Sequence, residues 1–274
     1  SHKGTFGNLL LIAGSNRYTG AAALMVEAAL RTGVGLVVVI CTHLTAQVIR
    51  VRCPEAIIVE VEEEGGVFHK TAIDKISHTI NDYHFSAIGM GPGVGSLKNE
   101  SDFYHQLMSL FSKLTCHILF DEYALAQAFQ WVQSNSFTEN QLVFTPHPKE
   151  FLRMIGLSAI EDVNKEVLNA SKQVSQIIVY KTHSTIVGSY EGIWRSSTGN
   201  QSLATAGSGD VLAGIISSFM AQGVSVTDAA KIGVYLHGLV AEIASNKLGL
   251  RAVLARDLCD FISAGLMALG ESNA

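Results

Sequence analysis

The segment Ala206-Gly207-Ser208-Gly209-Asp210 runs directly into the apolar stretch Val211-Leu212-Ala213-Gly214-Ile215-Ile216. Its glycines allow the backbone to turn sharply and a ligand to approach it closely. Free N–H groups at the start of a helix form a binding site for an anion. The spacing therefore predicts an anion-binding turn that opens a helix over residues 208–222, with one apolar stripe facing the core.

Asp210 is the acidic residue at the rim of this turn. A carboxylate repels phosphate, which indicates that it faces a hydroxyl group that attacks a phosphate. Asp210 would orient or deprotonate that hydroxyl while the N–H groups stabilise the developing charge. Because a helix N-terminus lowers the pKa of a carboxyl group, orientation is favoured over basicity. An Asp that only complements the helix dipole is an equally weighted alternative on spacing alone.

Short aliphatic runs alternate with amphipathic stretches along the rest of the chain. The runs are apolar on both faces, as buried parallel strands are. They cover residues 8–13, 36–41, 57–61, 85–90, 116–120, 141–144 and 177–180. The helical stretches between them cover residues 21–32, 44–51, 71–82, 100–112, 124–134 and 160–176. Repeated strand–helix units predict a mostly parallel sheet with helices on both faces.

The pattern changes after Tyr180. Residues 184–188 and 192–196 are predicted to form two short strands around a turn, hence an antiparallel hairpin. Helices are expected over residues 208–222, 226–247 and 254–269. The acidic run of Glu60 and Glu62-Glu63-Glu64 is interpreted as a solvated turn. Because no repeat and no Pro- and Ser-rich linker divides the chain, we expect one α/β domain over residues 1–274.

The composition excludes several classes of protein. The chain has 274 residues, of which 48% are hydrophobic and 16% charged, which suits a folded α/β domain. A net charge of −5 without a broad basic face argues against a nucleic-acid partner. The longest aliphatic run, residues 36–41, is far shorter than the roughly 20 residues that span a bilayer. We expect a cytoplasmic protein without membrane association, whose four widely spaced cysteines stay reduced.

Two segments that follow predicted strands are candidate ligand contacts. Gly91-Pro92-Gly93-Val94-Gly95 stands where ligands bind in open α/β sheets, although a tight turn fixed by Pro92 is the commoner use of such a segment. In Thr145-Pro146-His147-Pro148, two prolines stiffen the backbone on either side of His147. We slightly favour a ligand contact for His147 over a capping role in a helix-entry turn.

Three further positions have both a functional and a plain structural interpretation. Lys181 is suited to reach a nucleotide phosphate or to lie on the surface. Asn200 is a candidate ligand contact or a turn residue. The first turn, residues 14–21, is favoured as a site of close packing, with Thr19 as the expected helix cap.

Taken in order, these segments resemble the NAD(P)H-hydrate dehydratase family of the ribokinase-like superfamily. The resemblance covers nearly the whole chain. Its diagnostic stretches are Ala13-Gly14-Ser15, Thr19-Gly20-Ala21-Ala22, Gly91-Pro92-Gly93, Thr145-Pro146-His147-Pro148, Thr198-Gly199-Asn200 and residues 207–214. It implies a three-layer αβα sandwich with a mostly parallel central sheet and a short antiparallel hairpin near the C-terminal third. It also implies an enzyme that uses ADP or ATP with Mg²⁺ to restore NADH or NADPH from the (S)-hydrate, in which water has added across a nicotinamide ring double bond.

The resemblance also assigns roles to residues. Asp210 matches the substrate-contacting acid and is the expected catalytic residue, and Ala21, Gly93 and His147 match positions that contact the hydrate. The nucleotide-binding positions are matched by Lys181, Thr182, His183, Ser184, Thr185, Asn200, Gly207, Ser208 and Gly209. No residue is predicted as a direct metal ligand. Family members usually form homo-oligomers, often tetramers, and the epimerase domain that precedes this one in bifunctional relatives is not expected here.

The sequence departs from the usual family pattern at several positions. Glu122 stands where Ala is more usual, and Lys149 and Thr182 stand where Gly is. We expect Glu122 and Lys149 to alter surface charge or oligomer contacts. Two other functions are open: a vitamin-precursor-type kinase of the same superfamily, which would release a phosphorylated product, and a non-catalytic nucleotide-binding regulator. ADP and ATP are both open as the phosphoryl donor, and so are NADH hydrate and NADPH hydrate as the preferred substrate.

Overall fold

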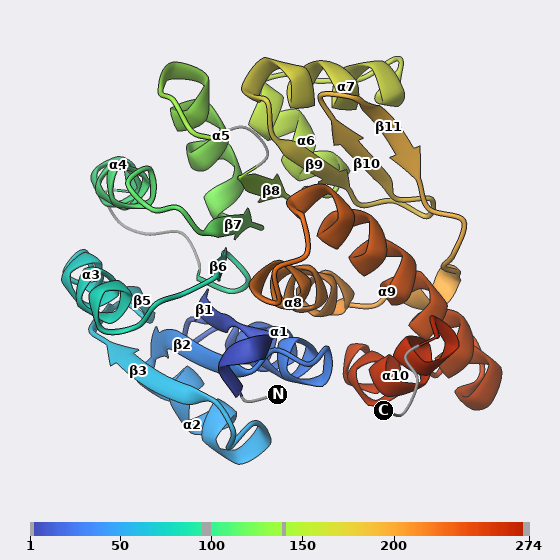
Figure 1. The fold of residues 1–274 in the computed structure, drawn as a ribbon, viewed down its shortest axis with the longest axis horizontal. Helices are drawn as coiled ribbons and strands as arrows, with labels where there is room; N and C mark the ends of the chain where they lie inside the picture. Colours follow the sequence, from blue (N-terminus) through green and yellow to red (C-terminus); the bar gives the residue numbers. More distant parts are fainter. Residues whose placement is uncertain (1–2, 95–99, 139–140, 271–274) are drawn as a thin grey trace.

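Parallel strands form most of the central sheet (Figure 1). They are β1 (Asn8–Ile12), β2 (Leu36–Thr42), β3 (Ile57–Val61), β6 (Ala87–Met90), β7 (His117–Phe120), β8 (Leu142–Phe144) and β9 (Ile177–Tyr180). The strands β10 (Ile186–Ser189) and β11 (Gly192–Arg195) extend it antiparallel beyond β9. This computed structural model describes residues 3–94, 100–138 and 141–270, and within them nine strands are ordered β11-β10-β9-β8-β7-β6-β1-β2-β3.

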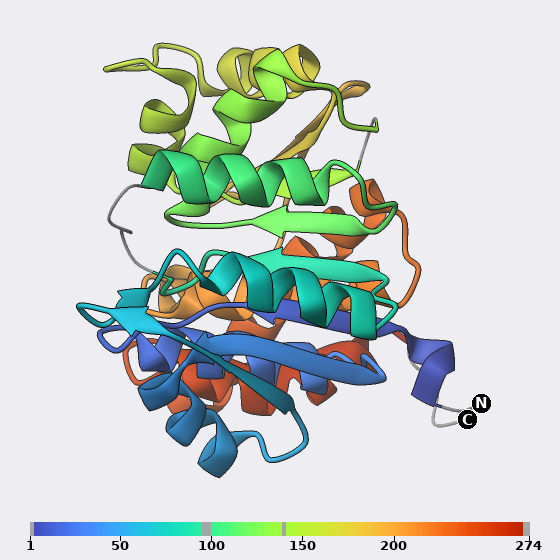
Figure 2. The same ribbon diagram turned by 90° about the vertical axis from the view of Figure 1, so that its left-hand side faces the viewer.

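Helices cover both faces of the sheet. One face carries α3 (Ala72–Asp82), α4 (Glu100–Phe111), α5 (Ala124–Ser134), α6 (Pro148–Ile155) and α7 (Val163–Val174). The other carries α1 (Thr19–Arg31), α2 (His43–Arg52), α8 (Ser208–Ala221) and α9 (Val226–Leu248), and α10 (Ala255–Ala268) packs outside them against α9. In Figure 1, α3 and α4 lie to the left of the sheet and α8, α9 and α10 to the right. Figure 2, seen from the side of α3 and α4, shows these helices lying in front of the strands.

The strands are apolar on both faces because each face has its own core. In β1, Leu10 and Ile12 pack into the core beneath α3–α7, whereas Leu9 and Leu11 pack into the core beneath α1, α2, α8 and α9. All four side chains are fully buried. Side chains alternate between the two faces of a strand. When helices cover both faces, the sequence of the strand is therefore an unbroken apolar run.

The structure confirms the predicted α/β fold class and its αβα layers, with small shifts at the element ends. Three local predictions differ from it. The acidic run forms a small hairpin, β4 (Glu63–Glu64) and β5 (Val67–Phe68), turned by Gly65 and Gly66 at φ +64° and +85°. A separate helix, α6, precedes the one predicted over residues 160–176, which begins at Val163. Thr19 is the first residue of α1 and not its cap: Tyr18 holds that position, without a side-chain capping bond.

The cysteine prediction is confirmed, since Cys41, Cys53, Cys116 and Cys259 are free thiols. Across residues 3–94, 100–138 and 141–270, no helix has the length and apolar character needed to cross a membrane. The feature that positions the site is the common direction of β1 and β6–β9. Their carboxyl ends lie at one edge of the sheet, so the loops that follow them meet there.

Candidate active site

Lys181 is the centre of a charged cluster at this edge. It follows β9, and its Nζ lies 2.6 Å from Oδ1 of Asp121, which follows β7, and 4.0 Å from Oε2 of Glu150 in the first turn of α6. The side chain of Lys181 is 17% exposed and that of Asp121 is 1% exposed. Burial by itself lowers the pKa of the Lys181 ammonium, but Asp121 and Glu150 together raise that pKa above its ordinary value. Lys181 is therefore a fixed positive charge inside the site and not a surface lysine.

Asp210 faces this cluster from the first turn of α8. It is 8% exposed. Burial, together with the nearby charges of Asp121 and Glu122, raises the pKa of its carboxyl group to about 8, although Lys181 acts in the opposite direction. The expectation that the helix N-terminus would lower this pKa is wrong, because burial and neighbouring carboxylates outweigh the helix dipole. At neutral pH most of the Asp210 carboxyl is therefore protonated, and it becomes able to accept a proton, as a general base must, as pH rises through about 8.

The glycine turn places Lys181 directly against the start of α8. Gly207 caps this helix at φ +90°. A Cβ atom on Gly209 would lie 3.3 Å from Lys181 Nζ, so a side chain at this position would crowd the ammonium unless Lys181 shifted. The amides of Ser208 and Asp210 donate to the carbonyl oxygens of Thr205 (3.3 Å) and Gly207 (3.1 Å). Gly209 is thus the amide of this turn that we expect to meet an anion.

The other predicted nucleotide positions form the turn between β9 and β10. Thr182 Oγ1 donates to the Ser184 carbonyl oxygen at 3.0 Å, and Thr185 Oγ1 donates to the Thr182 carbonyl oxygen at 3.1 Å. His183 is exposed at the tip of the turn, and Ser184 is partly buried. These hydroxyl bonds give the turn a fixed shape in the absence of any glycine. Its contact with a nucleotide stays a prediction.

Asn200 and Ser208 already have partners within the protein. Asn200 Oδ1 accepts hydrogen bonds from the N–H (2.9 Å) and hydroxyl (2.6 Å) of Ser202, and its Nδ2 donates to Ser245 Oγ at 2.8 Å. Ser208 Oγ lies 3.2 Å from Nε2 of the buried His237. The structure thus gives Asn200 the turn-forming role, and a nucleotide contact at either residue stays a prediction.

The residues predicted to contact the hydrate divide into two places. Ala21 and Gly93 lie together: a Cβ atom on Gly93 would be 3.1 Å from Ala21 Cβ and 2.8 Å from Tyr18 Cβ. His147 instead caps α6, where its Nδ1 accepts hydrogen bonds from the N–H groups of Lys149 (3.1 Å) and Glu150 (3.3 Å). The structure therefore gives His147 the capping role that the sequence reasoning placed second. Contact between its exposed imidazole and the hydrate stays a prediction.

Glu122 is a site residue that the sequence reasoning misplaced. Its carboxylate points into the site, and an effect of Glu122 on oligomer contacts stays a prediction. Its Oε2 accepts a hydrogen bond from the Gly93 N–H at 2.7 Å, across 29 residues of sequence. Burial, with the charges of Asp121 and Glu150, raises the pKa of Glu122 to about 6, against the opposing effects of the Gly93 N–H and Lys181. The side chain thus joins the loop after β6 to the loop after β7.

Asp121 and Glu150 are site residues that the sequence reasoning did not name. Asp121 directly follows a buried strand, as Lys181 does, and this position was a usable signal. Glu150 completes a capping box with His147, because its Oε2 accepts the His147 N–H at 2.8 Å. A capping-box Glu three residues after the cap was recognisable from spacing. Its proximity to Lys181 depends on the tertiary fold.

Gly91→Ala is expected to destabilise the fold by about 2–3 kcal/mol. Gly91 has φ +130°, and a Cβ atom there would overlap the backbone carbonyl of Asp121, which cannot move aside as a side chain can. Gly20→Ala is the control, because a Cβ atom at Gly20 meets nothing within 4 Å, and alanine is favoured in a helix. Urea unfolding at equilibrium measures both. Equal stability of the two variants would contradict the close approach of the β6 and β7 loops.

A family profile described as NAD(P)H-hydrate dehydratase matches residues 9–264. This span contains every element of the site described above. The chain belongs to the NAD(P)H-hydrate dehydratase family. The predicted resemblance is thereby confirmed, and the charged cluster at the sheet edge is a feature of a dehydratase-family domain.

Curated proteins of this family match the chain over most of its length. The ADP-dependent (S)-NAD(P)H-hydrate dehydratase of Neisseria meningitidis is 33% identical over 93% of this chain and 82% of its own length. The enzyme of the same name from Bacillus subtilis is 31% identical over 96% of this chain and 90% of its own length. The bifunctional NAD(P)H-hydrate repair enzyme of Moorella thermoacetica is 30% identical over 98% of this chain but only 51% of its own length. The chain thus spans about half the length of such bifunctional relatives.

Solved structures confirm that this dehydratase-family chain has the ribokinase-like fold. The Bacillus subtilis ADP/ATP-dependent NAD(P)H-hydrate dehydratase, co-crystallised with ATP and Mg²⁺, superposes with a TM-score of 0.81 and 28% identity, over 98% of this chain and 91% of that one. A ribokinase-like superfamily protein from Enterococcus faecalis superposes with a TM-score of 0.80 and 26% identity, over 97% and 89% of the two chains.

Proposed function

We propose that this family member is a hydro-lyase that restores NADH or NADPH from the (S)-hydrate in a reaction driven by ADP or ATP. The observation that carries the proposal is the position of Asp210. Its carboxyl is buried at the start of α8, has a pKa raised to about 8, and stands beside the fixed charge of Lys181. Family membership and the curated relatives supply the substrate class.

In the proposed reaction, the hydroxyl oxygen of the hydrated ring attacks the terminal phosphorus of the nucleotide. A bond forms between that oxygen and phosphorus, and the bond from phosphorus to the shorter nucleotide breaks. Asp210 orients the hydroxyl and accepts its proton. Phosphate is a better leaving group than hydroxide, so the ring nitrogen lone pair then expels phosphate. Loss of a proton from the adjacent ring carbon restores the double bond.

Lys181 and Gly209 are proposed to stabilise the charge that develops on the transferred group. The ammonium and the α8 N-terminus are held against each other before any ligand binds, so no reorganisation is needed during the reaction. Residues 181–185, Asn200, Gly207 and Ser208 are the remaining proposed nucleotide contacts. Ala21, Gly93 and His147 are proposed to contact the hydrate.

Mg²⁺ is the proposed metal cofactor. Among residues 3–94, 100–138 and 141–270, no group of three or more His, Cys, Asp or Glu side chains could hold a metal ion. Magnesium commonly binds through one or two carboxylates together with substrate phosphates. Asp121 Oδ2, which is buried and has no hydrogen-bond partner in the described structure, and the carboxylate of Glu150 fit that requirement. When bound there, the ion would offset negative charge on the phosphates.

We also propose a cytoplasmic homotetramer, on the strength of the family resemblance. Large apolar side chains are exposed in the loop between α9 and α10, at Leu250 (43%) and Leu254 (47%), and near the end of α10, at Met267 (61%). Burial of such side chains between subunits would favour assembly. Light scattering coupled to gel filtration measures the mass of the assembly directly.

The proposal is tested by absorbance at the reduced-nicotinamide band. Purified protein, Mg²⁺ and NADH hydrate are mixed with ADP or with ATP in separate cuvettes. A rise that requires the nucleotide supports the dehydratase and identifies its donor. No rise with either nucleotide, in folded protein, contradicts it. A phosphorylated product in place of inorganic phosphate would instead identify a small-molecule kinase.

The pH dependence of turnover is expected to follow Asp210. Because its pKa is raised to about 8, most of the carboxyl is protonated at neutral pH and cannot accept the hydroxyl proton. The value of kcat/KM should therefore rise as pH rises through about 8, and level off above it. Initial rates at low hydrate concentration, from about pH 6 to pH 9.5, measure this. A profile that is flat or that falls over this range would contradict the role of Asp210 as a base.

A further inference from the structure

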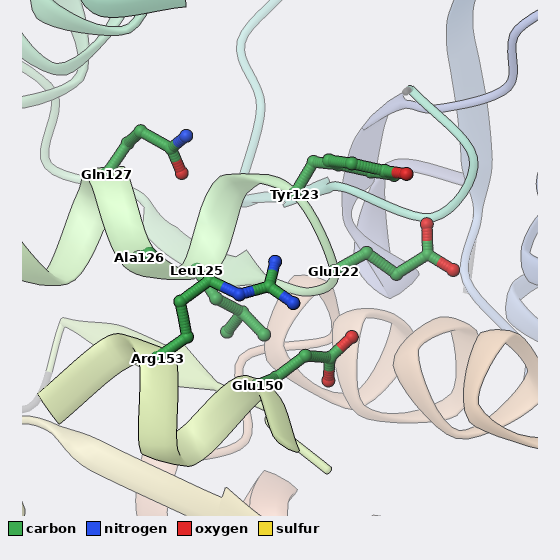
Figure 3. Close-up of a pocket in the computed structure, with 7 residues that line it drawn as sticks. All are labelled: Glu122, Tyr123, Leu125, Ala126, Gln127, Glu150 and Arg153. Atoms are coloured by element: carbon green, nitrogen blue, oxygen red, sulfur yellow. The ribbon is translucent and has the colours of Figure 1, made fainter. Parts of the chain in front are cut away.

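The two sides of the proposed active site are held in different ways. On one side, the carboxylates of Glu122 and Glu150 point into the same space from the loop before α5 and the first turn of α6, as Figure 3 shows. Glu122, at φ +50°, is bonded to the Gly93 N–H, and Glu150 is bonded to the His147 N–H. On the other side is the turn that opens α8, and its support comes from a different part of the fold.

The composition of this turn does not give it one fixed shape. Two glycines, Gly207 and Gly209, lie on either side of Ser208. Glycine loses more conformational freedom on folding than any other residue, so ordering such a turn is costly. Gly209 carries the N–H group that we expect to meet an anion. Ser208 is the residue between the glycines that has a side chain, and it is therefore the point at which the rest of the protein can anchor the turn.

His237 of α9 anchors Ser208. The Oγ atom of Ser208 lies 3.2 Å from Nε2 of His237, and both residues are buried, with exposures of 5% and 6%. Within the part of the chain that the structure describes, His237 is the one hydrogen-bond partner of the Ser208 hydroxyl. A buried hydroxyl that loses its partner is costly, so this bond holds the side chain in one position. The bond thereby fixes the residue between the two glycines.

Packing alone does not explain a histidine at this position. His237 is the one titratable side chain among the buried residues of α9, a helix that the structure describes in full. Burial lowers the pKa of its ring to about 4, the Ser208 backbone acts in the opposite direction, and the charge of Lys181 lowers the pKa further. The ring is therefore neutral at physiological pH. An apolar side chain would fill the same space without the cost of burying a polar ring, so the hydrogen bond to Ser208 is the reason for the histidine.

The same helix holds the second proposed nucleotide segment. Glu242 Oε1 accepts a hydrogen bond from the Gly199 N–H at 2.8 Å, and Ser245 Oγ accepts one from Asn200 Nδ2 at 2.8 Å. A Cβ atom on Gly238 would lie 2.7 Å from the backbone nitrogen of Gly199, so the two backbones lie in close contact. Helix α9 is thus a common support for this segment and for the turn that opens α8.

We propose that His237 is a positioning residue for the nucleotide: through Ser208, it holds the glycine turn in the shape in which the Gly209 N–H meets a phosphate. This inference rests on the proposed function, because it takes the nucleotide as the ligand of the turn. In this role His237 touches no reacting atom. It keeps the Gly209 N–H in place beside the Lys181 ammonium before the nucleotide arrives, so binding does not have to order the turn.

The test compares His237→Met with His237→Gln by titration calorimetry with ADP and with ATP. Met and Gln are similar in length and volume, but only Gln can bond the Ser208 hydroxyl. We expect His237→Met to weaken nucleotide binding about five- to tenfold, the effect of losing one hydrogen bond, and His237→Gln to recover most of that loss. In turnover, the KM for the nucleotide should rise in His237→Met while the KM for the hydrate does not.

His117→Met is the matched control for these variants. The pKa of His117 is also lowered by burial, but His117 begins β7, at the edge of the sheet opposite the site. His117→Met should therefore bind both nucleotides as the wild-type protein does.

Ser208→Ala shows whether His237 acts through Ser208. Each single variant, His237→Met or Ser208→Ala, leaves one buried polar group without its partner and should unfold at a lower urea concentration than the wild type. The double variant leaves neither group and should recover stability, because both partners are then apolar. Its nucleotide binding should nevertheless stay as weak as that of Ser208→Ala, since the two changes remove the same interaction.

Three results would overturn the proposal: wild-type nucleotide affinity in His237→Met, recovery of affinity together with stability in the double variant, or additive losses of affinity. The expected pattern in a protein that turns over no hydrate would support His237 as a positioning residue and reject the dehydratase alone. If the folded wild-type protein binds neither ADP nor ATP, both proposals are rejected.

Discussion

Asp210→Asn should lower turnover of the hydrate by about 10²–10⁴-fold while nucleotide binding persists. The amide has nearly the same shape as the carboxyl and can still accept a hydrogen bond, but it cannot take the hydroxyl proton. Turnover is measured by nicotinamide absorbance, and nucleotide binding by calorimetry with ADP. Asp228→Asn is the matched control. Asp228 is the third residue of α9, as Asp210 is of α8, but it is exposed and bonded to the helix cap Ser225.

The stability of Asp210→Asn separates a catalytic role from a capping role. The pKa of the Asp210 carboxyl is about 8 in the folded protein, above its ordinary value of 3.8. The folded state therefore loses stability as pH rises from about 4 to about 8, because the charged form is held less well than in the unfolded chain. Asp210→Asn should then melt at a higher temperature than the wild type at pH 8. A lower melting temperature, as for loss of a helix-dipole partner, would favour the purely structural role.

Lys181→Met should destabilise the fold by about 3–5 kcal/mol, because it leaves Asp121 as a buried charge without a partner. Asp121 is 1% exposed, and Lys181 Nζ is 2.6 Å from it. The same change should raise the pKa of Asp210 further, since Lys181 is the group that lowers it. Urea unfolding measures the stability, and the pH profile of kcat/KM measures the pKa.

Two further variants show whether the ion pair is the cause. Lys149→Met removes a charge of the same sign from an exposed position in the first turn of α6 and should change stability by less than about 0.5 kcal/mol. Adding Asp121→Asn to Lys181→Met should recover part of the lost stability, since no buried charge is left unpaired, but no activity. If Lys181→Met and Lys149→Met unfold at the same urea concentration, the buried ion pair of Lys181 and Asp121 does not stabilise the fold as expected.

Much of the fold was predictable because the sequence patterns that specify it are local. Apolar runs with helices between them specify parallel strands, and Gly207-Ser208-Gly209-Asp210 before an apolar stripe specifies the start of α8. The pKa of Asp210 was not predictable in the same way. A helix N-terminus lowers the pKa of a nearby carboxyl group. At Asp210 this local effect was outweighed by burial and by the carboxylates of Asp121 and Glu122, which follow β7 and are far away in sequence.

Glu122, Glu150 and His147 show why the rest of the site required the fold. The residues around Glu122 do not predict its positive φ, and the Gly93 N–H that its carboxylate accepts is 29 residues away in sequence. The two prolines beside His147 correctly indicated a rigid segment. They did not indicate that the His147 ring would accept hydrogen bonds from the N–H groups of its own helix. That bonding is part of the capping box with Glu150. The order of the strands in the sheet determines which side chains meet at its edge. No single segment of the sequence predicts that order.

Dehydration through a phosphorylated intermediate is tested by measuring two products in one reaction. Wild-type protein is mixed with NADH hydrate, Mg²⁺ and the nucleotide that supports turnover, and reduced nicotinamide and inorganic phosphate are followed together. We expect both to appear in equal amounts and at equal rates, and Asp210→Asn to produce neither. Phosphate without reduced nicotinamide, or a stable phosphorylated product without phosphate, would contradict dehydration at this site.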